Sequence, residues 1–417
     1  MALLICGYNV SMTNNDTPLL FTPIKLRSVT ARNRIVVSPM CQYHSVDGGP
    51  TDWQLMHLGR LCVGGPGIVF GEETAVEDIG RKTYACAGLY KDEHVPAYRR
   101  LNDFIREQGA VPAIQLGHAG RKASCHTAVE SWRPLRDEDV ADGMPPWQGL
   151  APSALPDPPR RFLPKEMDLD DIARVKEAFR IATLRSAEAG YDILEIHGAH
   201  GYLIHQFLSP ASNHRTDAYG GDIEGRMRFA LELAEVTRAA WPADKPLFWR
   251  ISAVDGAGGI WNLKDSVILS QALKDRDVDL IDVSSGGISG NSKMPMVPRL
   301  DGYQTDFSDR IRKETGRTVG LTWSHWHGNC CGMLTGRPMR QRPLVFRTHL
   351  TVCRMNMPSV CVNASARRKC RSIRSAQNRK RHFATSWESE MTGMVLRTVP
   401  VPPLFPEPAI PKTHQLS

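Results

Sequence analysis

The chain has 417 residues, of which 41% are hydrophobic and 23% are charged, a balance typical of a soluble globular protein. No run of about 18 apolar residues indicates a transmembrane helix, and ten cysteines are too sparse for a small disulfide-stapled domain, so we expect a cytoplasmic protein without a membrane partner. A net charge of +8 can indicate an anionic partner such as nucleic acid, but the charge is unevenly distributed along the chain, and nucleic acid is not the partner we expect.

Short apolar runs alternate with amphipathic stretches through most of the chain, after an N-terminal extension at residues 1–19. The runs predict strands at residues 34–39, 67–70, 111–116, 192–197, 246–252 and 279–284, and the start of a seventh at 318–321. Most of these runs are almost continuously apolar, which is expected of parallel strands that are buried on both faces. The pattern predicts βαβ units over residues 20–320.

The stretches between the strands carry apolar residues at spacings of three and four, which predicts helices. The clearest sets are Ile172, Val175, Phe179 and Ala182, and Met227, Ala230, Leu231 and Ala234. Glycines that suit helix C-termini stand at positions 109, 190 and 316. Strands followed by helices favour an α/β fold of the (β/α)₈ TIM barrel type, and no G-x-G-x-x-G follows the first strand. A doubly wound sheet stays open, because strand number does not prove closure.

Residues 124–165, which contain several Pro and Trp, interrupt this rhythm after the third strand. We interpret them as a loop excursion over the carboxyl ends of the strands, where barrels carry their sites.

The rhythm stops after Leu321. Residues 321–417 hold fifteen Lys and Arg side chains, three Glu and no Asp, a net charge of +12, which leaves −4 for residues 1–320. No eighth strand is found in this segment, so we expect a barrel that is incomplete at its C-terminal end. The abrupt change of composition suggests translation in a shifted reading frame near residue 321, and a genuine basic domain is the alternative.

The strongest chemical motif is EIHGAHGYLIHQFLSPASNHRTDAYGG at residues 195–221. His197 ends the fourth strand, and His200 and Tyr202 follow in the next loop, so all three are expected at the mouth of the barrel. Two imidazoles can donate hydrogen bonds to one carbonyl oxygen, and a nearby phenol can deliver a proton. The H-x-x-H spacing also fits a metal pair, but the sequence supplies no third ligand, so we predict no metal.

Three further clusters lie at predicted strand ends. NRIVVSPMCQYH contains Cys41, which is either a redox-responsive thiol or a small buried residue. AIQLGHAGRKA contains Gln115 and the basic residues His118, Arg121 and Lys122, which suit an anionic ligand or a solvated loop. Arg250 stands within LFWRIS, where a buried guanidinium needs a polar partner.

Over about residues 20–320 these motifs, in this order, resemble the Old Yellow Enzyme family of NADH:flavin oxidoreductases and NADH oxidases, and closely its bacterial branch with a cysteine beside the flavin. The resemblance implies a (β/α)₈ barrel that binds FMN and reduces activated alkenes with NAD(P)H in a ping-pong reaction. Its small-molecule substrate would be an α,β-unsaturated carbonyl compound, and a homo-oligomer stays open.

The resemblance also implies roles for individual residues. Ser38, Pro39, Met40 and Cys41 would line the flavin, Gln115 would bond its pyrimidine edge, and Arg250 would stabilise the reduced anion. His197 and His200 would hold the substrate carbonyl, Tyr202 would donate the proton, and Tyr43 would shape the substrate pocket.

Two departures from the family pattern stand out. Glu73 occupies a position where the family usually has a small residue packed by the flavin. The turns that would bind the FMN phosphate are not recognisable after Leu321. The alternatives to an ene-reductase are therefore an inactive barrel remnant that does not retain FMN, or a barrel with a nucleic-acid-binding tail.

Overall fold

The computed structural model describes residues 17–157, 162–256, 259–288 and 302–316, and the backbone of residues 318–322 and 331–335. The chain divides into two units, Met1–Arg340 and Gln341–Ser417, and every element described below lies in the first unit. Predictions about residues 1–16 and about the tail after residue 335 lie outside the described residues.

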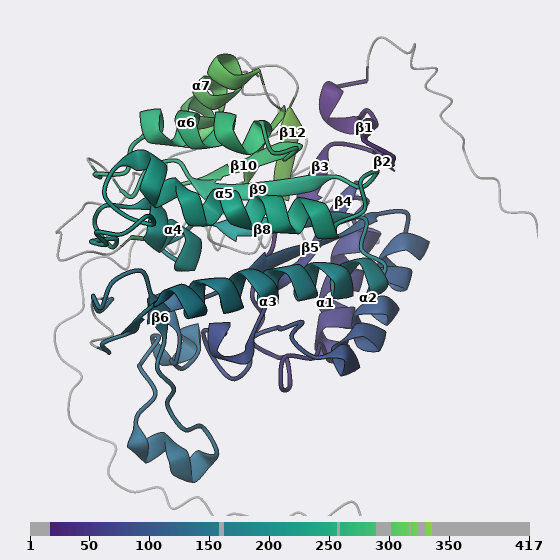
Figure 1. The fold of residues 1–417 in the computed structure, drawn as a ribbon. Coiled ribbons are helices and arrows are strands. Elements are labelled where there is room, and N and C mark those ends of the chain that lie inside the picture. Colours follow the sequence, from purple (N-terminus) through teal and green to yellow (C-terminus); the bar gives the residue numbers. More distant parts are fainter. Residues whose placement is uncertain are drawn as a thin grey trace, which may run out of the picture. The chain divides into compact units, whose positions relative to one another are not determined.

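The core of the first unit is a closed ring of eight strands, and most of these strands are labelled in Figure 1. In order around the ring these are β10 (Leu280–Ser284), β11 (Thr318–Thr322), β12 (Cys331–Thr335), β3 (Ile35–Val37), β4 (Ile68–Ala75), β5 (Val111–Gly117), β8 (Ile193–Gly198) and β9 (Leu247–Ser252). Neighbouring strands are parallel except where β12 pairs with β11 and β3. The predicted α/β barrel is confirmed, and each strand predicted from the sequence is present.

The ring closes in a way that the sequence did not predict. Among the described residues the series of parallel strands stops at β11, as expected of a barrel that is incomplete at its C-terminal end. The eighth place is taken by β12, which comes from the segment after Leu321 where no strand was expected, and it runs antiparallel to both neighbours. The backbone ring is therefore complete, although an eighth parallel βα unit is not seen in the described part of the chain.

Helices cover the outside of the ring at the predicted places. They are α1 (Asp52–Val63), α2 (Val95–Glu107), α3 (Leu169–Glu188), α5 (Ile223–Ala240), α6 (Leu263–Lys274) and α7 (Thr305–Thr315), with the short α4 (Leu203–Leu208) directly after β8. The 3₁₀ turns are η1 (Leu19–Phe21), η2 (Asp78–Gly80), η3 (Asp92–His94), η4 (Gly120–Lys122), η5 (Ala128–Glu130) and η6 (Asp137–Asp142). In the described part of the chain, no helix has the length and apolar character needed to cross a membrane.

Helix ends follow the expected rules. Thr51, Asp168 and Asn262 accept hydrogen bonds from first-turn N–H groups of α1, α3 and α6, which satisfies donors that have no partner within a helix. Gly109, Gly190 and Gly316 have φ angles of 77°, 83° and 65°, the left-handed conformation that ends a helix at little cost for glycine.

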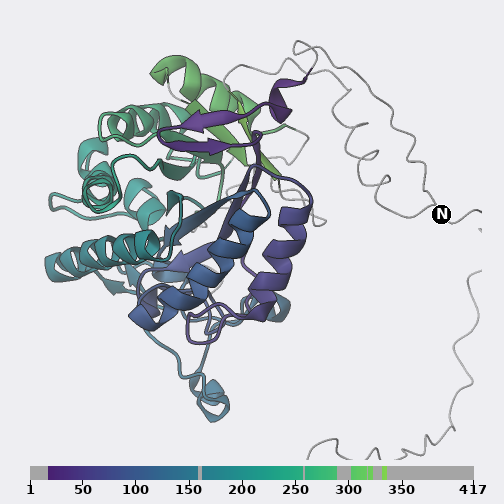
Figure 2. The ribbon, with the colours of Figure 1, turned by 90° about the vertical axis from the view of Figure 1, so that its right-hand side faces the viewer.

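An apolar floor closes the end of the barrel where the strands begin. The hairpin of β1 (Ile24–Leu26) and β2 (Val29–Ala31), purple in Figure 2, lies across this end. Its Leu26 and Ala31 belong to an apolar cluster with residues near the start of the ring strands: Val36, Ile68, Phe70, Ala113, Ile193, Phe248 and Leu280. Because apolar side chains fill this end of the barrel, we look for polar functional groups at the opposite end, which we call the mouth.

The predicted excursion at residues 124–165 contains η5, η6 and the small parallel pair of β6 (Leu150–Ala151) and β7 (Lys165–Glu166). Part of it projects from the barrel below β6 in Figure 1. Its base is tied to the body, because the N–H of Cys125 donates to the carbonyl of Lys82 (2.9 Å).

Candidate active site

The carboxyl end of β8 carries the three residues that were predicted to act on the substrate. His197 is a buried residue of the strand, His200 follows with a left-handed φ of 58°, and Tyr202 directly precedes α4. The His197 ring centroid lies 5.0 Å from that of His200 and 5.1 Å from that of Tyr202. The structure thus gathers the predicted residues at the barrel mouth.

A histidine that the sequence analysis did not single out holds this loop in place. His205 is fully buried in α4, and its Nδ1 accepts the N–H of Gly201 (2.9 Å). Its Nε2 lies 2.9 Å from the Oδ1 of Asp255, whose Oδ2 accepts the hydroxyl of Ser209 (2.7 Å). The signal that was available is its position in LIHQFL, where an isolated polar ring on an apolar helix requires buried partners.

Burial keeps the rings of His197 and His200 neutral. It lowers the pKa of His197 well below its usual value, with the neighbouring His200 and Arg250 adding to the effect. Burial likewise lowers the pKa of His200, reinforced by Arg250 and His205. The Nε2 of His200 lies 2.6 Å from the hydroxyl of Ser284. In contrast, the Nδ1 of His197 is buried without a hydrogen-bond partner among the described residues, so it is free to bind a ligand.

A buried polar layer crosses the barrel beside the histidines, and its Arg250 is the register partner of His197. The side-chain amide of Gln115 on β5 donates to Glu195 on β8 (Nε2 to Oε1, 2.7 Å). The Nε of Arg250 on β9 lies 3.3 Å from the Oδ2 of Asp282 on β10, yet it makes no hydrogen bond within the described residues. Burial and the charge of Asp282 raise the pKa of Glu195 to about 8, although Arg250 and the hydrogen bond from Gln115 oppose the rise.

The residues after β3 form the wall of the mouth nearest to β4. Ser38 is buried, Pro39 and Met40 are half-buried, and Met40 packs against a cluster that contains Val37 and Val69. Tyr43 has a left-handed φ of 57°, and its ring meets the edge of Trp132 from the excursion at 5.4 Å. This contact places part of the excursion beside the predicted substrate pocket.

An ion pair that the sequence analysis did not predict occupies the same wall. The ammonium of Lys82 pairs with the carboxylate of Glu73 on β4, and both side chains are buried. The Nζ of Lys82 also lies 3.3 Å from the Sγ of Cys41 and 5.1 Å from the ring centroid of Tyr202. A Cβ on Gly117 would lie 2.3 Å from the Oε1 of Glu73, so glycine at this position makes room for the carboxylate. Glu73, the residue that departs from the family pattern, is thus accommodated by a cation and by a glycine.

The basic residues of AIQLGHAGRKA are engaged within the protein. His118 lies 2.8 Å from the carboxylate of Glu77 (Nε2 to Oε1), and Arg121 is buried near Asp157. Lys122 donates to the carbonyls of His200 (2.8 Å) and Gly287 (2.5 Å) and thereby joins the loops that follow β8 and β10. Lys122 also lies 5.5 Å from the ring centroid of Tyr202. These contacts correspond to neither of the two alternatives expected for this run, an anion site or a solvated loop.

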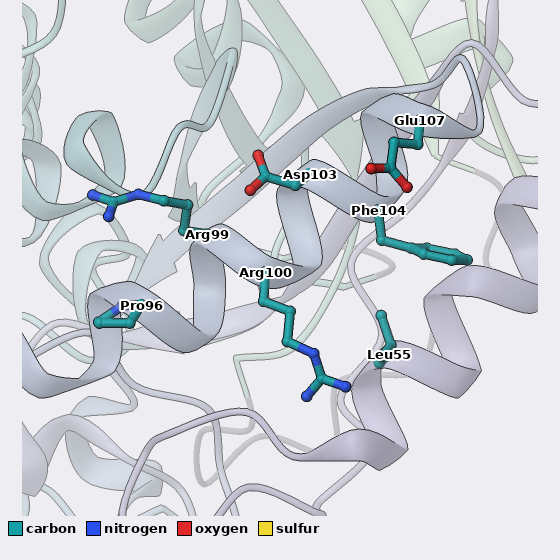
Figure 3. A pocket seen from close by; sticks show the side chains of 7 residues that line it. All are labelled: Leu55, Pro96, Arg99, Arg100, Asp103, Phe104 and Glu107. Atoms are coloured by element: carbon teal, nitrogen blue, oxygen red, sulfur yellow. The ribbon is translucent and has the colours of Figure 1, made fainter.

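A further pocket lies away from the barrel mouth. A pocket of about 450 Å³ between α1 and α2 is lined by the residues in Figure 3, among them Leu55, Arg99 and Glu107, and it contains no predicted site residue. The described residues contain no group of three or more His, Cys, Asp or Glu that could hold a metal ion. Cys41, Cys62, Cys86 and Cys125, the cysteines whose side chains the structure describes, are free thiols.

Comparison with known proteins points to one family. A family model described as NADH:flavin oxidoreductase / NADH oxidase matches residues 19–308. The NADPH dehydrogenase of Geobacillus sp. is 42% identical over 304 residues, which cover 72% of this chain and 82% of the relative. The NADPH dehydrogenase of Bacillus subtilis is 38% identical over 327 residues, which cover 78% of this chain and 86% of the relative.

Solved structures show the same fold. The Old Yellow Enzyme homologue from Zymomonas mobilis superposes with a TM-score of 0.59 at 24% identity, over 74% of this chain and 83% of that chain. Morphinone reductase in complex with tetrahydroNAD gives a TM-score of 0.58 at 23% identity, over 73% and 80% of the two chains.

Proposed function

Because the chain belongs to the NADH:flavin oxidoreductase / NADH oxidase family, the family of the Old Yellow Enzymes, we propose that it is an FMN-dependent ene-reductase that uses NAD(P)H. Its substrate class is an α,β-unsaturated carbonyl compound, reduced in a ping-pong reaction. The observation that carries this proposal is the cluster of His197, His200 and Tyr202 at one strand end, with centroid distances of 5.0 and 5.1 Å.

The polar layer of the barrel fits the isoalloxazine ring of FMN. Arg250 keeps a buried Nε without a hydrogen bond, although burial of an unpaired guanidinium N–H is costly. A flavin carbonyl would satisfy that donor, and the positive charge would favour the reduced, anionic cofactor. We assign the pyrimidine edge to Gln115 and the ring contacts to Ser38, Pro39, Met40 and Cys41. A bound FMN would supply the hydride transfer between NAD(P)H and the alkene.

The two histidines hold the substrate carbonyl oxygen. Neutral imidazoles each donate through one N–H, and a negative charge that develops on the oxygen strengthens these hydrogen bonds in the transition state. When the hydroxyl of Ser284 donates to the Nε2 of His200, the ring carries its proton on Nδ1 and can donate from that side. Tyr43 shapes the pocket from the opposite wall.

Tyr202 supplies the proton that completes reduction of the carbon–carbon double bond. The ammonium groups of Lys82 and Lys122 lie 5.1 and 5.5 Å from its ring centroid. Positive charge at this distance stabilises the tyrosinate that forms when the proton leaves. The side chain therefore stands in an environment suited to a general acid.

A visible spectrum of the purified full-length protein tests the proposal. We expect bound flavin that bleaches with NADPH under anaerobic conditions and recovers its colour with cyclohexenone. A colourless protein that takes up no added FMN would instead establish the inactive remnant. Salt-sensitive binding to DNA would point to a nucleic-acid function of the basic tail.

The proposal extends to the remaining sequence predictions. We propose a cytoplasmic enzyme, whose oligomeric state light scattering can measure, with an atypical basic segment at residues 321–417 that contributes β12 to the barrel ring. The reading-frame hypothesis is supported by the composition of that tail. Translation of the other frames of the gene near residue 321 must then yield a glycine-containing seventh strand and an arginine-bearing eighth turn, and failure to find them would refute it.

A further inference from the structure

In the proposed reaction Lys82 acts only on Tyr202, and Glu73, its buried ion-pair partner, has no assigned part. Only 2% of the Lys82 surface and 7% of the Glu73 surface is exposed. Two buried charges lose their hydration, and their mutual attraction must offset that loss. A pair of this kind is therefore held tightly, and each member strongly affects any group beside it.

The group beside it is the thiol of Cys41, whose Sγ lies 3.3 Å from the Nζ of Lys82. A lysine next to a cysteine normally stabilises the thiolate and makes the sulfur reactive. Here the same ammonium is bound by a carboxylate, whose negative charge opposes the field of the ammonium at the sulfur. Burial raises the pKa of Cys41 to about 12, Lys82 opposes this rise, and Glu73 adds to it.

We propose that Glu73 and Lys82 are positioning residues for Cys41. Glu73 holds the ammonium of Lys82 in an ion pair and so keeps the thiol of Cys41 protonated and weakly nucleophilic. The charged and titratable groups facing the sulfur are Lys82 after η2, Glu72 and Glu73 from β4, Cys86 and Tyr43. The inference concerns side chains of this protein, and it does not depend on the proposed alkene reduction.

The test measures alkylation of Cys41 by iodoacetamide as a function of pH, with each cysteine quantified separately by peptide mass spectrometry. In Glu73→Gln the untied ammonium should favour the thiolate, and each unit of lowered pKa raises the rate at neutral pH about tenfold. In Lys82→Met the lone carboxylate should disfavour the thiolate, and the rate should fall below that of the wild type. The double variant, which has no charge at either position, should return to within a few-fold of the wild-type rate.

The opposite signs of the two single variants separate this role from a purely structural one. Each single variant leaves one buried charge without its partner, so loosening of the structure would accelerate alkylation in both. Cys62, which is buried in α1 and absent from the groups around Cys41, serves as the internal reference.

Opposite shifts at Cys41 with an unchanged Cys62 support the proposal. Shifts of the same sign, or no change, overturn it. If Glu73→Gln does not fold, Lys82→Met and the double variant decide: an increased rate in Lys82→Met, or a double variant that differs from the wild type more than tenfold, also overturns it.

Discussion

The two sides of the barrel mouth bury polar groups in different ways. On the β8 side, His197 and His200 are neutral, because burial lowers their pKa values well below the usual range. On the β4 side, Lys82 and Glu73 carry opposite charges and are paired. A buried neutral group without a partner costs about 1–3 kcal/mol, whereas removing one partner of a buried ion pair costs about 3–5 kcal/mol.

This difference explains which side can exchange partners. The β8 side can keep the Nδ1 of His197 unbonded until a substrate arrives, because the cost is modest. On the β4 side, neither Lys82 nor Glu73 can leave its partner at so small a cost. This pair therefore stays in place and acts on neighbouring groups through its charges. The mouth thus has a β8 side that can bind a substrate and a β4 side whose contacts stay fixed. The following substitutions test this difference between the two sides.

The largest effect is expected on the β8 side, from Tyr202→Phe. Loss of the general acid should slow alkene reduction about 10²–10⁴-fold, while reduction of the flavin by NADPH stays near the wild-type rate. Stopped-flow absorbance measures the two half-reactions separately. Equal slowing of both half-reactions would contradict the assigned role, because it would indicate damage to the whole site.

On the β4 side, Glu73→Gln should reduce the free energy of unfolding by about 3–5 kcal/mol, since it leaves the buried ammonium of Lys82 unpaired. The double variant Glu73→Gln/Lys82→Met is the matched control and should recover most of that loss. Urea unfolding followed by circular dichroism measures both. A double variant that is less stable than the single one would show that the charges do not depend on each other.

Between the two sides, Glu195 should make stability depend on pH. Its pKa is about 8 in the folded protein, above its usual value of 4.5, so the folded state binds the extra proton between these values. Stability should therefore be full below about pH 4.5 and should fall as the pH rises toward 8, by about 2–4 kcal/mol. Glu195→Gln should remove this dependence and can still accept the hydrogen bond from Gln115. Unfolding of the FMN-free protein at pH 5 and pH 8 gives the comparison, and identical slopes in both proteins would exclude Glu195 as the source.

The smallest effect is expected from Lys122→Met, which removes the link between the carbonyls of His200 and Gly287. Hydrogen bonds from a charged donor contribute about 1.5–3 kcal/mol, and part of this should appear as a several-fold rise in the KM for the alkene. Steady-state kinetics with NADPH in excess measures it. A lower kcat at constant KM would show that Lys122 acts only through its charge beside Tyr202 and not through loop placement.

Most strands of the barrel and the residues of the β8 side could be predicted from the sequence. The features that could not be predicted have physical reasons. Strands such as 193–198 were found because continuous apolar runs bounded by helical periodicity have few alternatives, and His197, His200 and Tyr202 followed from their position after one strand. The Lys82–Glu73 pair was missed because its members are nine residues apart on different elements, and no local pattern reports a contact between them. β12 was missed because its sequence, CGMLT, lies in a segment without periodicity, and its pairing partners are set by the ring.

The hairpin of β1 and β2 that seals the barrel floor also constrains how the protein is made. Arg27, in the turn of the hairpin, donates to Asp279 (2.7 Å), a residue 252 positions later in the chain, and Leu26 belongs to the same apolar cluster as Leu280. Synthesis of that intervening length takes on the order of 10–50 s. During that interval the nascent chain holds an apolar hairpin whose docking surface does not yet exist. The hairpin is therefore synthesised early, but the apolar cluster that it joins is completed only after β10 has been synthesised. A nascent chain that ends before β10 would expose apolar side chains that are buried in the finished protein.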